Sequence, residues 1–434
     1  MGTLKNSPYF LILFVVTSLT SLSLVNVEAK THWQDVEVLQ QLKNKVEPNS
    51  VSPGSCLSSW DFSVDPCDSL FSEKFSCGFR CDLVVSDMTR VTELALDQPG
   101  YTASLASINW NLPYLQILDL SSNNFYGDIP ESFSNLTRVT RLSLSRNWFA
   151  GQIPSSIGSL SSLEELFLDN NILQGTIPSS FNGLISLKRL EIQSNKLYGE
   201  FPELSSLKNL YFLDASDNAI SGTLSPSSFP PSLIQISIRN NSLQGTIPEN
   251  LKNLGFLQVL DLTHNKLTGA VPSFLFTHPS LQQLTLSFNS FTSVQSPWPF
   301  FSLASTNTIQ SELIAMDLSN NQIQGFLPAF LALMPKLSAL SLENNKFTGM
   351  IPTQFAIKAA LGSSGLVLPF ERLLLGGNYL FGAIPVALME LKAGSVDVRL
   401  NDNCLFRCPT SLFFCQGGDQ KSLGECKSFS PFIP

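Results

Sequence analysis

Residues Leu160 to Pro178 read LSSLEELFLDNNILQGTIP and contain the pattern that decides the fold. A Leu-x-Leu pair is followed by an asparagine three residues after the second leucine, and then by Gly-x-Ile-Pro. The pattern recurs between Val91 and Asn403, most often every 24 residues, as from Asn147 to Asn171. Such a period indicates a solenoid of stacked coils. The recurring asparagines are Asn123, Asn147, Asn171, Asn195, Asn218, Asn241, Asn265, Asn289, Asn321, Asn345, Asn378 and Asn403.

The repeated units predict an α/β repeat solenoid of about thirteen coils, counting an incomplete first unit at Leu94 and Leu96. Each coil is too small to bury its own apolar face, so alternating leucines such as Leu142 and Leu144 are expected to pack against those of neighbouring coils. The recurring asparagine is expected to turn inward at the end of each strand. There its amide must bond to backbone groups, because an unsatisfied buried amide costs about 1–3 kcal/mol.

The segment between one strand and the next predicts a turn and a short helical stretch. Gly151 permits a tight turn, and Pro154 begins an extended segment while withholding a backbone donor. Apolar residues then recur every three positions from Ile157 to Leu166, which is compatible with a 3₁₀ turn. This turn is expected to close the core opposite the strands.

Eight cysteines fall into two groups of four, one on each side of the repeats. In a secreted chain an even number of cysteines indicates disulfides. Zinc binding by each group is disfavoured because an oxidising compartment favours disulfides over thiolate ligands. Each group allows three pairings, and the sequence does not choose among them. The cysteines are Cys56, Cys67, Cys77 and Cys81, then Cys404, Cys408, Cys415 and Cys426.

The first 29 residues have the features of a cleavable secretion signal. Lys5 precedes an apolar run from Tyr9 to Val25, which ends in the pattern Val27-Glu28-Ala29. A membrane anchor is the alternative, but the unbroken apolar part is shorter than the ~20 residues that a span requires. We therefore predict a secreted protein without a transmembrane span of its own. Its formal net charge of −8 disfavours nucleic acid and polyanionic polysaccharide as main partners.

The repeat from Leu160 to Pro178 resembles the plant-specific class of leucine-rich repeats. LSSW from Leu57, DPC from Asp65 and CGFRC from Cys77 look like the N-terminal cap of plant receptor-like proteins, receptor-kinase ectodomains and polygalacturonase-inhibitor proteins. The end of the chain, from Asn401 to Cys426, resembles the C-terminal cap of the same proteins. The resemblance implies a superhelical solenoid with a second small sheet and with both ends of the core sealed.

The resemblance and the cysteines together divide the chain into four parts. They are a signal peptide (1–29), an N-terminal cysteine cap (30–90), the repeats (91–403) and a C-terminal cysteine cap (404–434). Two features depart from the family. The usual Trp-x-Gly-Val-x-Cys of the cap is replaced by the residues from Phe75 to Cys81, and neither a membrane span nor a kinase domain follows the repeats. Direct signalling by this chain is therefore not expected.

The residues between the inward leucines are expected to project from the concave face, where stacked coils form a continuous surface. Arginine and aromatic side chains dominate interface energetics, which favours the second to sixth full coils as the binding region. The alternative is a solvated face held by salt bridges. The aspartates that recur in the strands, such as Asp119, are expected to keep the face soluble and not to act as catalytic carboxylates. The candidate partner-binding residues are Arg141, Arg146, Glu165, Phe167, Asp169, Arg189, Glu191 and Phe212.

Two sequons are candidate glycosylation sites in a secreted protein: Asn135 with Thr137, and Asn240 with Ser242. Asn135 is expected away from the concave strands. Asn240 precedes a ladder asparagine, so a glycan there would crowd the middle of the concave face.

The asparagine spacing lengthens twice, to 32 residues between Asn289 and Asn321 and to 33 between Asn345 and Asn378. Each interval therefore holds an insertion, and insertions in solenoids are expected in loops. The first includes Pro297 to Phe301 and the second Gly362 to Gly365. They resemble, in reduced form, the island segments of some plant receptors; plain long loops are the alternative.

No catalytic constellation is present in the sequence. The three histidines, His32, His264 and His278, are isolated, and every cysteine belongs to a cap. Neither a metal-ligand motif nor a phosphate-binding glycine loop occurs. We expect neither an enzyme nor a cofactor.

The sequence thus favours a secreted recognition module of plant signalling or defence, in the apoplast or cell wall or peripheral at the outer plasma membrane. The expected partner is a protein or peptide ligand, including the ectodomain of a membrane receptor kinase. Two alternatives stay open. One is an inhibitor of a microbial cell-wall hydrolase, which the longer array and the insertions disfavour. The other is a structural protein of the wall, which the acidic charge disfavours.

Overall fold

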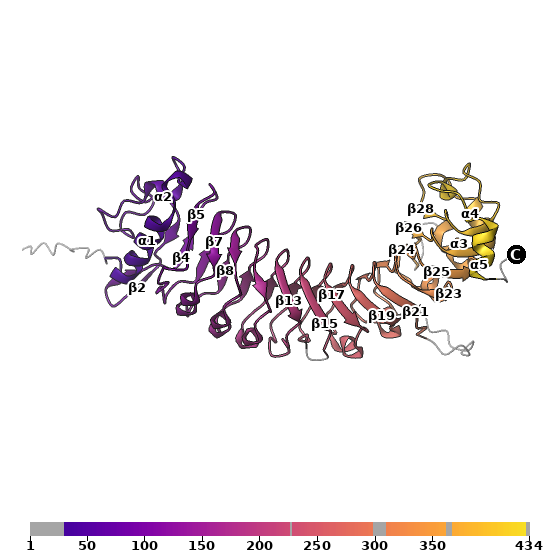
Figure 1. Cartoon of the computed structure of the whole chain (residues 1–434), viewed down its shortest axis with the longest axis horizontal. Helices are drawn as coiled ribbons and strands as arrows, with labels where there is room; N and C mark the ends of the chain where they lie inside the picture. Colours follow the sequence, from indigo (N-terminus) through magenta and orange to yellow (C-terminus); the bar gives the residue numbers. More distant parts are fainter. Residues whose placement is uncertain (1–29, 226–227, 298–309, 362–366, 431–434) are drawn as a thin grey trace, which may run out of the picture.

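A computed structural model of the chain describes residues 30–225, 228–297, 310–361 and 367–430. The described part is an arc of stacked coils with a cap at each end (Figure 1). Its main feature is a 14-stranded sheet in which β1 pairs antiparallel with β4, and every later neighbouring pair is parallel. The predicted capped solenoid is confirmed. In order, the strands are β1 (Phe79–Arg80), β4 (Glu93–Ala95), β6 (Ile117–Asp119), β8 (Arg141–Ser143), β10 (Glu165–Phe167), β12 (Arg189–Glu191), β14 (Phe212–Asp214), β16 (Gln235–Ser237), β18 (Val259–Asp261), β20 (Gln283–Thr285), β22 (Ala315–Asp317), β24 (Ala339–Ser341), β26 (Arg372–Leu374) and β28 (Asp397–Arg399).

A second set of short parallel strands runs along the array in three smaller sheets, which confirms the second sheet implied by the family resemblance. The glycine of the repeat lies in or beside these strands with a positive φ, for example 85° at Gly175, a backbone region that favours glycine. The strands are β5 (Thr102–Ser104), β7 (Asn124–Asp128) and β9 (Trp148–Ala150); β11 (Gln174–Gly175), β13 (Lys196–Glu200), β15 (Ala219–Thr223), β17 (Ser242–Gly245), β19 (Lys266–Val271) and β21 (Ser290–Val294); and β23 (Gln324–Phe326), β25 (Lys346–Gly349), β27 (Tyr379–Ala383) and β29 (Cys404–Phe406).

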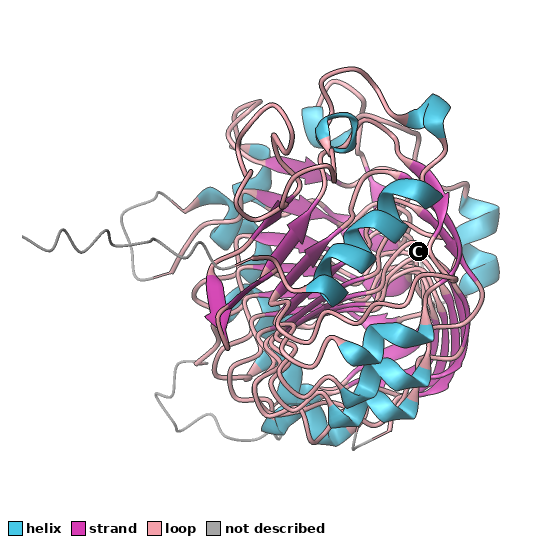
Figure 2. Ribbon diagram, turned by 90° about the vertical axis from the view of Figure 1, so that its left-hand side faces the viewer, coloured by secondary structure: helices cyan, strands magenta, loops and turns pink. Residues whose placement is uncertain are grey.

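Short helical turns close most of the described coils, although none lies between β13 and β14. The 3₁₀ turn predicted after Pro154 is confirmed as η3 (Ser155–Ser159), and its counterparts line up along one side of the array when it is viewed end-on (Figure 2). The interval with the second insertion differs, because an α-helix, α3 (Thr353–Ala360), takes the place of the 3₁₀ turn and packs against η7 and α4. The other turns are η2 (Glu131–Asn135), η4 (Ser179–Gly183), η5 (Glu249–Asn253), η6 (Ser273–Phe276), η7 (Ala329–Leu333) and α4 (Val386–Met389).

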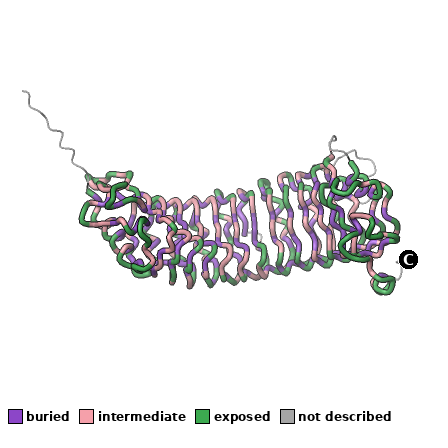
Figure 3. Tube along the Cα trace, turned by 90° about the horizontal axis from the view of Figure 1, so that it is seen from above, coloured by how far each residue is buried: buried purple, intermediate pink, exposed green. Residues whose placement is uncertain are grey.

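The core is one continuous stack of apolar side chains. Buried and exposed positions alternate in the same way in successive coils along the whole array (Figure 3). Leu142, Leu166 and Leu190 lie opposite one another in β8, β10 and β12, and each is fully buried. Because every coil buries its leucines against two neighbours, stability is shared along the array and not held by single coils.

The predicted asparagine ladder is confirmed. The side-chain amide of Asn171 donates to the carbonyls of Leu144 (2.9 Å), Leu168 (3.1 Å) and Asp169 (3.1 Å), and its oxygen accepts from the N–H of Phe149 (2.9 Å). The same arrangement recurs at successive asparagines, as at Asn345 and Asn403. One side chain thus satisfies backbone groups of its own coil and of the preceding coil, which links the two.

The N-terminal cap consists of α1, α2, the hairpin β2–β3 and two disulfides, Cys56–Cys77 and Cys67–Cys81. Its helix α1 is tied to the hairpin by a buried ion pair between Asp35 and Arg90 (2.6 Å), and the N–H of Val91, the first residue of the repeats, also donates to Asp35 (2.8 Å). Trp60 packs edge-on against Phe79 beside the first disulfide. These contacts cover the first leucines of the array. The bounds are α1 (Trp33–Lys45), η1 (Pro48–Ser50), α2 (Cys56–Ser59), β2 (Leu83–Val85) and β3 (Met88–Arg90).

The C-terminal cap contains η8 (Phe413–Cys415), α5 (Leu423–Phe429) and the disulfides Cys404–Cys426 and Cys408–Cys415. The pairings that the sequence left open are thus local within each cap. Gln420 takes the place of the next ladder asparagine: its amide donates to the carbonyl of Leu400 (2.9 Å), and its oxygen accepts from the N–H of Leu405 (3.1 Å). The cap therefore satisfies the last open backbone groups of the ladder.

Some sequence-based expectations fall outside the described residues. They are the signal peptide at 1–29, the first insertion from Trp298 onward and the second insertion at Gly362 to Gly365. Within the described ranges, no helix has the length and apolar character needed to cross a membrane.

Replacing Gly158 with alanine is expected to destabilise the array, because adjacent 3₁₀ turns meet closely there. A Cβ at this position would lie 2.3 Å from the carbonyl oxygen of Ser180 in the next turn. Overpacking of this kind costs about 1–3 kcal/mol. Urea denaturation should show the loss. The control is Gly255→Ala, because a Cβ at Gly255 meets no atom within 4 Å; that change should leave stability the same or raise it by up to about 1 kcal/mol. Equal effects of the two changes would contradict the packing argument.

His278 is expected to make stability fall at acidic pH. Its side chain is buried, its Nδ1 accepts from the N–H of Ser280, and burial lowers its pKa below the ordinary 6.5. The unfolded chain therefore binds a proton at pH values where the folded chain does not. The stability from neutral His278 is complete above about pH 6.5 and is lost as the pH falls through the lowered folded pKa, with a slope of at most about 1.4 kcal/mol per pH unit.

The measurement for His278 compares urea midpoints between pH 7.5 and pH 5. In His278→Asn, which retains an acceptor for Ser280 and does not titrate, the pH dependence should be smaller than in the wild type. The matched change at an exposed histidine, His264→Asn, controls for the effect of the substitution itself. A pH dependence that survives His278→Asn would show that other groups cause it.

Candidate functional site

The exposed face of the 14-stranded sheet, here called the sheet face, brings most of the candidate partner-binding residues together. Arg141, Glu165, Arg189 and Phe212 lie opposite one another in β8, β10, β12 and β14 and form one row. Phe167 and Glu191 form the adjacent row, two residues further along each strand. Residues 24 or 23 positions apart in the sequence thus become direct neighbours.

Ion pairs and cation–π contacts join these six residues into one surface, here called the arginine–phenylalanine patch. Arg141 pairs with Glu165 (2.6 Å), and its guanidinium lies 4.5 Å from the ring centre of Phe167. Arg189 pairs with Glu191 (2.5 Å) and lies 3.7 Å from the ring centre of Phe212. Each of these contacts is worth about 1 kcal/mol or less at a surface. Their main effect is to hold two arginines and two aromatic rings in fixed positions.

The patch has exposed groups that make no side-chain hydrogen bond within the described chain. All six side chains are partly exposed. Arg141 uses only Nη1 and Arg189 only Nε in side-chain hydrogen bonds within the described chain. The other guanidinium N–H groups are free to donate, and the rings offer apolar area beside them. A partner with carboxylate or carbonyl groups next to an apolar side chain fits this chemistry.

Two candidate residues lie outside the patch. Asp169 was expected on the exposed face, and this expectation is wrong: only 6% of it is exposed. Its carboxylate accepts from the hydroxyl of Ser145 in the preceding coil and from the amide of Asn170 (2.7 Å), so its contacts link coils. Arg146 is exposed in the turn that follows β8, with φ of 55°. It lines a shallow groove of about 430 Å³ together with Trp148.

The structure adds neighbours that sequence reasoning did not select. Lys188 pairs with Glu164 (2.8 Å) along the edge of the patch, and this hydrogen bond raises the pKa of Lys188. Asp214 lies beside Glu191, and burial raises the pKa of its carboxyl. Trp148 is 57% exposed. Lys188 lies 24 residues after Glu164, and Asp214 lies 23 residues after Glu191, so the repeat spacing could have predicted both neighbours. The exposure of Trp148 depends on the local strand geometry and could not be predicted in this way.

The two sequons occupy different surfaces. Asn135 ends η2, on the helical side of the coil and away from the large sheet, as expected. Asn240 is exposed in the turn after β16, where its amide donates to Asp217 (2.8 Å). Its place beside the sheet face agrees with the expected position.

The described residues also contain no group of three or more histidine, cysteine, aspartate or glutamate side chains placed to hold a metal ion. The sheet face carries side chains of both charges beside exposed aromatic rings.

Comparison with family models matches two parts of the repeat array. A leucine-rich-repeat model matches residues 231–291, and a second leucine-rich-repeat model matches 114–136, 138–160 and 162–184. No curated protein matches the sequence.

Several solved plant receptor structures are similar to the chain. The plant peptide hormone receptor RGFR1 in complex with RGF2 is 28% identical, with a TM-score of 0.65, over 76% of this chain and 50% of the receptor chain. A TDR receptor is 25% identical, with a TM-score of 0.61, over 78% of this chain and 60% of that chain. The ectodomain of the Arabidopsis receptor kinase HAESA, in complex with an N-terminally extended IDA peptide hormone, is 26% identical, with a TM-score of 0.57, over 86% and 66%. This chain spans one half to two thirds of their lengths.

The stacked coils, the asparagine ladder and the two disulfide caps define a leucine-rich-repeat solenoid. The chain contains leucine-rich repeats and is similar to solved plant receptors with leucine-rich repeats. The disulfides and these neighbours indicate an extracellular protein.

Proposed function

We propose that this protein is a non-catalytic recognition module that binds a protein or peptide partner through the arginine–phenylalanine patch. The observation that carries the proposal is the assembly of two arginines and two phenylalanines from four neighbouring strands into one partly exposed surface. Rings already held by guanidinium groups lose little freedom when a partner covers them. Low ordering cost and aromatic area favour binding.

The proposed setting is signalling or defence at the plant cell surface or in the apoplast, beside a membrane receptor kinase. RGFR1 and the HAESA ectodomain bind peptide hormones in the structures that resemble this chain. Proteins of the same architecture thus use it for peptide recognition, which supports a ligand-binding role here. Glycosylation at Asn135 would leave the sheet face open, and a glycan at Asn240 would restrict a partner to the coils before β16.

The test is to capture partners of the glycosylated protein from plant extracellular and membrane extracts and then to measure the affinity of each purified partner. The variant Arg141→Glu with Phe167→Ala removes the centre of the patch. Its matched control, Arg239→Glu with Phe288→Ala, makes the same changes at exposed residues in later coils. We expect the patch variant to bind at least about tenfold more weakly and the control to bind like the wild type.

The outcomes separate the possible functions. A receptor ectodomain or peptide that the patch variant loses supports the proposal. A hydrolase that loses activity on binding would replace it with the inhibitor hypothesis. A partner bound equally by both variants would show that the patch is not the site. Absence of any saturable partner would favour a structural role in the wall.

A further inference from the structure

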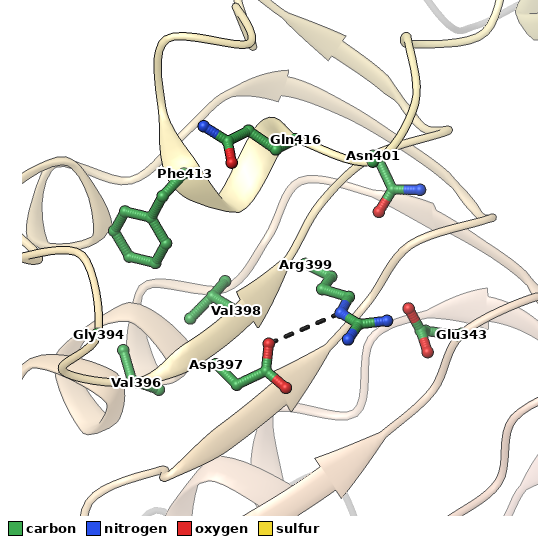
Figure 4. A pocket seen from close by; sticks show the side chains of 10 residues that line it. Glu343, Gly394, Val396, Asp397, Val398, Arg399, Asn401, Phe413 and Gln416 are labelled. Carbon is green, nitrogen blue, oxygen red and sulfur yellow. Dashed lines mark ion pairs between the residues drawn. The ribbon is translucent and has the colours of Figure 1, made fainter.

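A pocket lies at the C-terminal end of the sheet face, where the last strands meet the C-terminal cap. It encloses about 560 Å³, within the usual size range of small-molecule sites. Figure 4 shows the charged side chains of Glu343, Asp397 and Arg399 along one part of the pocket and Phe413 beside Val398 in another. The pocket is far along the array from the arginine–phenylalanine patch, because β14 and β28 are separated by six strands of the sheet.

The pocket owes part of its shape to a missing side chain. Strand register places Gly376 between Glu343 and Asn401, each two residues beyond the paired ends of β24, β26 and β28. A Cβ on Gly376 would lie 2.9 Å from Oδ1 of Asn401 and 3.3 Å from Oε1 of Glu343. The side-chain oxygens of Glu343 and Asn401 therefore both lie over the glycine. They form an acceptor-rich floor that any larger residue would disturb.

The carboxylate of Glu343 has no hydrogen-bond donor among the described residues. It is partly buried, and burial raises its pKa, with Asp317 and Asp397 acting in the same direction and Arg399 and Arg372 opposing. A desolvated carboxylate of this kind gains stability from a cationic donor.

Arg399 lines the pocket, Arg372 lies beside its Asp397, and both have guanidinium N–H groups that are free to donate. Arg372 and Arg399 both approach Asp397, at 3.5 Å and 3.6 Å, which is longer than a strong charged hydrogen bond. Neither guanidinium donates a side-chain hydrogen bond within the described part of the chain. Figure 4 shows the guanidinium of Arg399 between Asp397 and Glu343. An incompletely satisfied cation thus lies next to an incompletely satisfied anion.

We propose that this pocket binds a free α-amino acid with an apolar side chain. The ammonium group donates to Glu343 and to Oδ1 of Asn401, and the carboxylate accepts from Arg399. The side chain packs against Phe413 and Val398. A ligand with one charge would leave either the carboxylate of Glu343 without a donor or the guanidinium of Arg399 with only its long contact to Asp397, whereas a zwitterion satisfies both. This inference does not depend on the proposed partner-binding function, since it concerns another end of the sheet face.

The experiment titrates three probes into the full protein and follows binding by ligand-observed NMR. L-phenylalanine carries both charges, N-acetyl-L-phenylalanine lacks the ammonium group, and L-phenylalaninamide lacks the carboxylate. We expect saturable binding of L-phenylalanine, and binding weaker by about ten- to a hundredfold for each blocked probe, the effect of losing a charged hydrogen bond.

Variants assign each charge to its residue. Glu343→Gln should weaken L-phenylalanine to the level of its N-acetyl form, and Arg399→Gln should weaken it to the level of the amide. Gly376→Ala should weaken all three probes because it displaces the side chain of Asn401. The matched controls, Glu249→Gln and Arg239→Gln, lie outside the pocket and should bind like the wild type. Thermal unfolding of each variant separates loss of binding from loss of fold.

Three results would overturn the proposal. They are no saturable binding of L-phenylalanine at millimolar concentrations, binding of either blocked probe as tight as that of L-phenylalanine, or wild-type affinity for L-phenylalanine in a folded Glu343→Gln variant. None of these results bears on the partner-capture test, whose variants lie in other coils.

Discussion

Replacing Asp35 with alanine should lower the free energy of unfolding by about 3–5 kcal/mol, because it leaves a buried arginine without its partner. Asp35 is completely buried and Arg90 is 5% exposed. The carboxylate accepts from Nη2 (2.6 Å) and Nε (3.0 Å) of Arg90, and also from the N–H of Val91 (2.8 Å). Val91 is the first residue of the repeats, so the loss should undock α1 from the array.

Tryptophan fluorescence in a urea titration measures this effect, since Trp60 and Trp110 are fully buried in or near the cap. Hydrogen exchange at the N–H of Val91 should rise more than exchange in the central coils, because coils of a solenoid are stabilised by their neighbours. The control is Lys252→Ala, which breaks an exposed pair with Glu249 (3.1 Å) and should cost less than about 1 kcal/mol.

A second variant tests why the Asp35→Ala variant loses stability. Replacing both partners, Asp35→Leu with Arg90→Met, should recover part of the stability, because no buried charge is then left unpaired. If the double variant has a lower free energy of unfolding than the Asp35→Ala variant, the unpaired charge is not the cause of the destabilisation.

Replacing Asn171 with alanine should cost about 1–3 kcal/mol, the cost of one buried group left unsatisfied. The change leaves the N–H of Phe149 without its acceptor. The carbonyls of Leu144, Leu168 and Asp169 lose one donor each but keep the amide of Asn147, the amide of Asn195 and the N–H of Arg146, respectively. Relaxation or entry of water reduces the cost. The array should weaken at the boundary between β8 and β10, where the amide bridges two coils.

Urea denaturation and hydrogen exchange at Phe149 are the measurements for Asn171→Ala. Asn253→Ala removes the same side chain from an exposed position at the end of η5 and should change stability by no more than about 0.5 kcal/mol. Similar losses at Asn171 and Asn253 would show that the ladder contributes little beyond the leucine core.

The fold could be predicted from the sequence because the coils repeat the same short pattern of residues. Leucines at fixed intervals, one asparagine and a Gly-x-Ile-Pro turn recur often enough to determine the strands, the inward positions and the ladder. The six residues of the arginine–phenylalanine patch were also accessible from the sequence. Once the period of 24 is known, Arg141 and Glu165 must be neighbours in adjacent strands.

Spacing along the sequence does not determine which of several neighbouring groups a side chain contacts. Asp169 occupies an outward position of the repeat but folds down onto Ser145, so its burial depends on a hydroxyl in another coil. The pocket at Glu343 depends on Gly376 and on the approach of the C-terminal cap, neither of which carries a repeat signal.

The sequence by itself determined the solenoid, its core and the row of residues on the sheet face, because a short repeat places each position by spacing alone. Only the tertiary structure decided the disulfide pairings, the role of Gln420 in the ladder position after Asn403, and the pocket beneath the cap. The physical reason is that the caps do not repeat. Their contacts depend on how an irregular chain folds over the last open coil, and spacing along the sequence contains no information about that path.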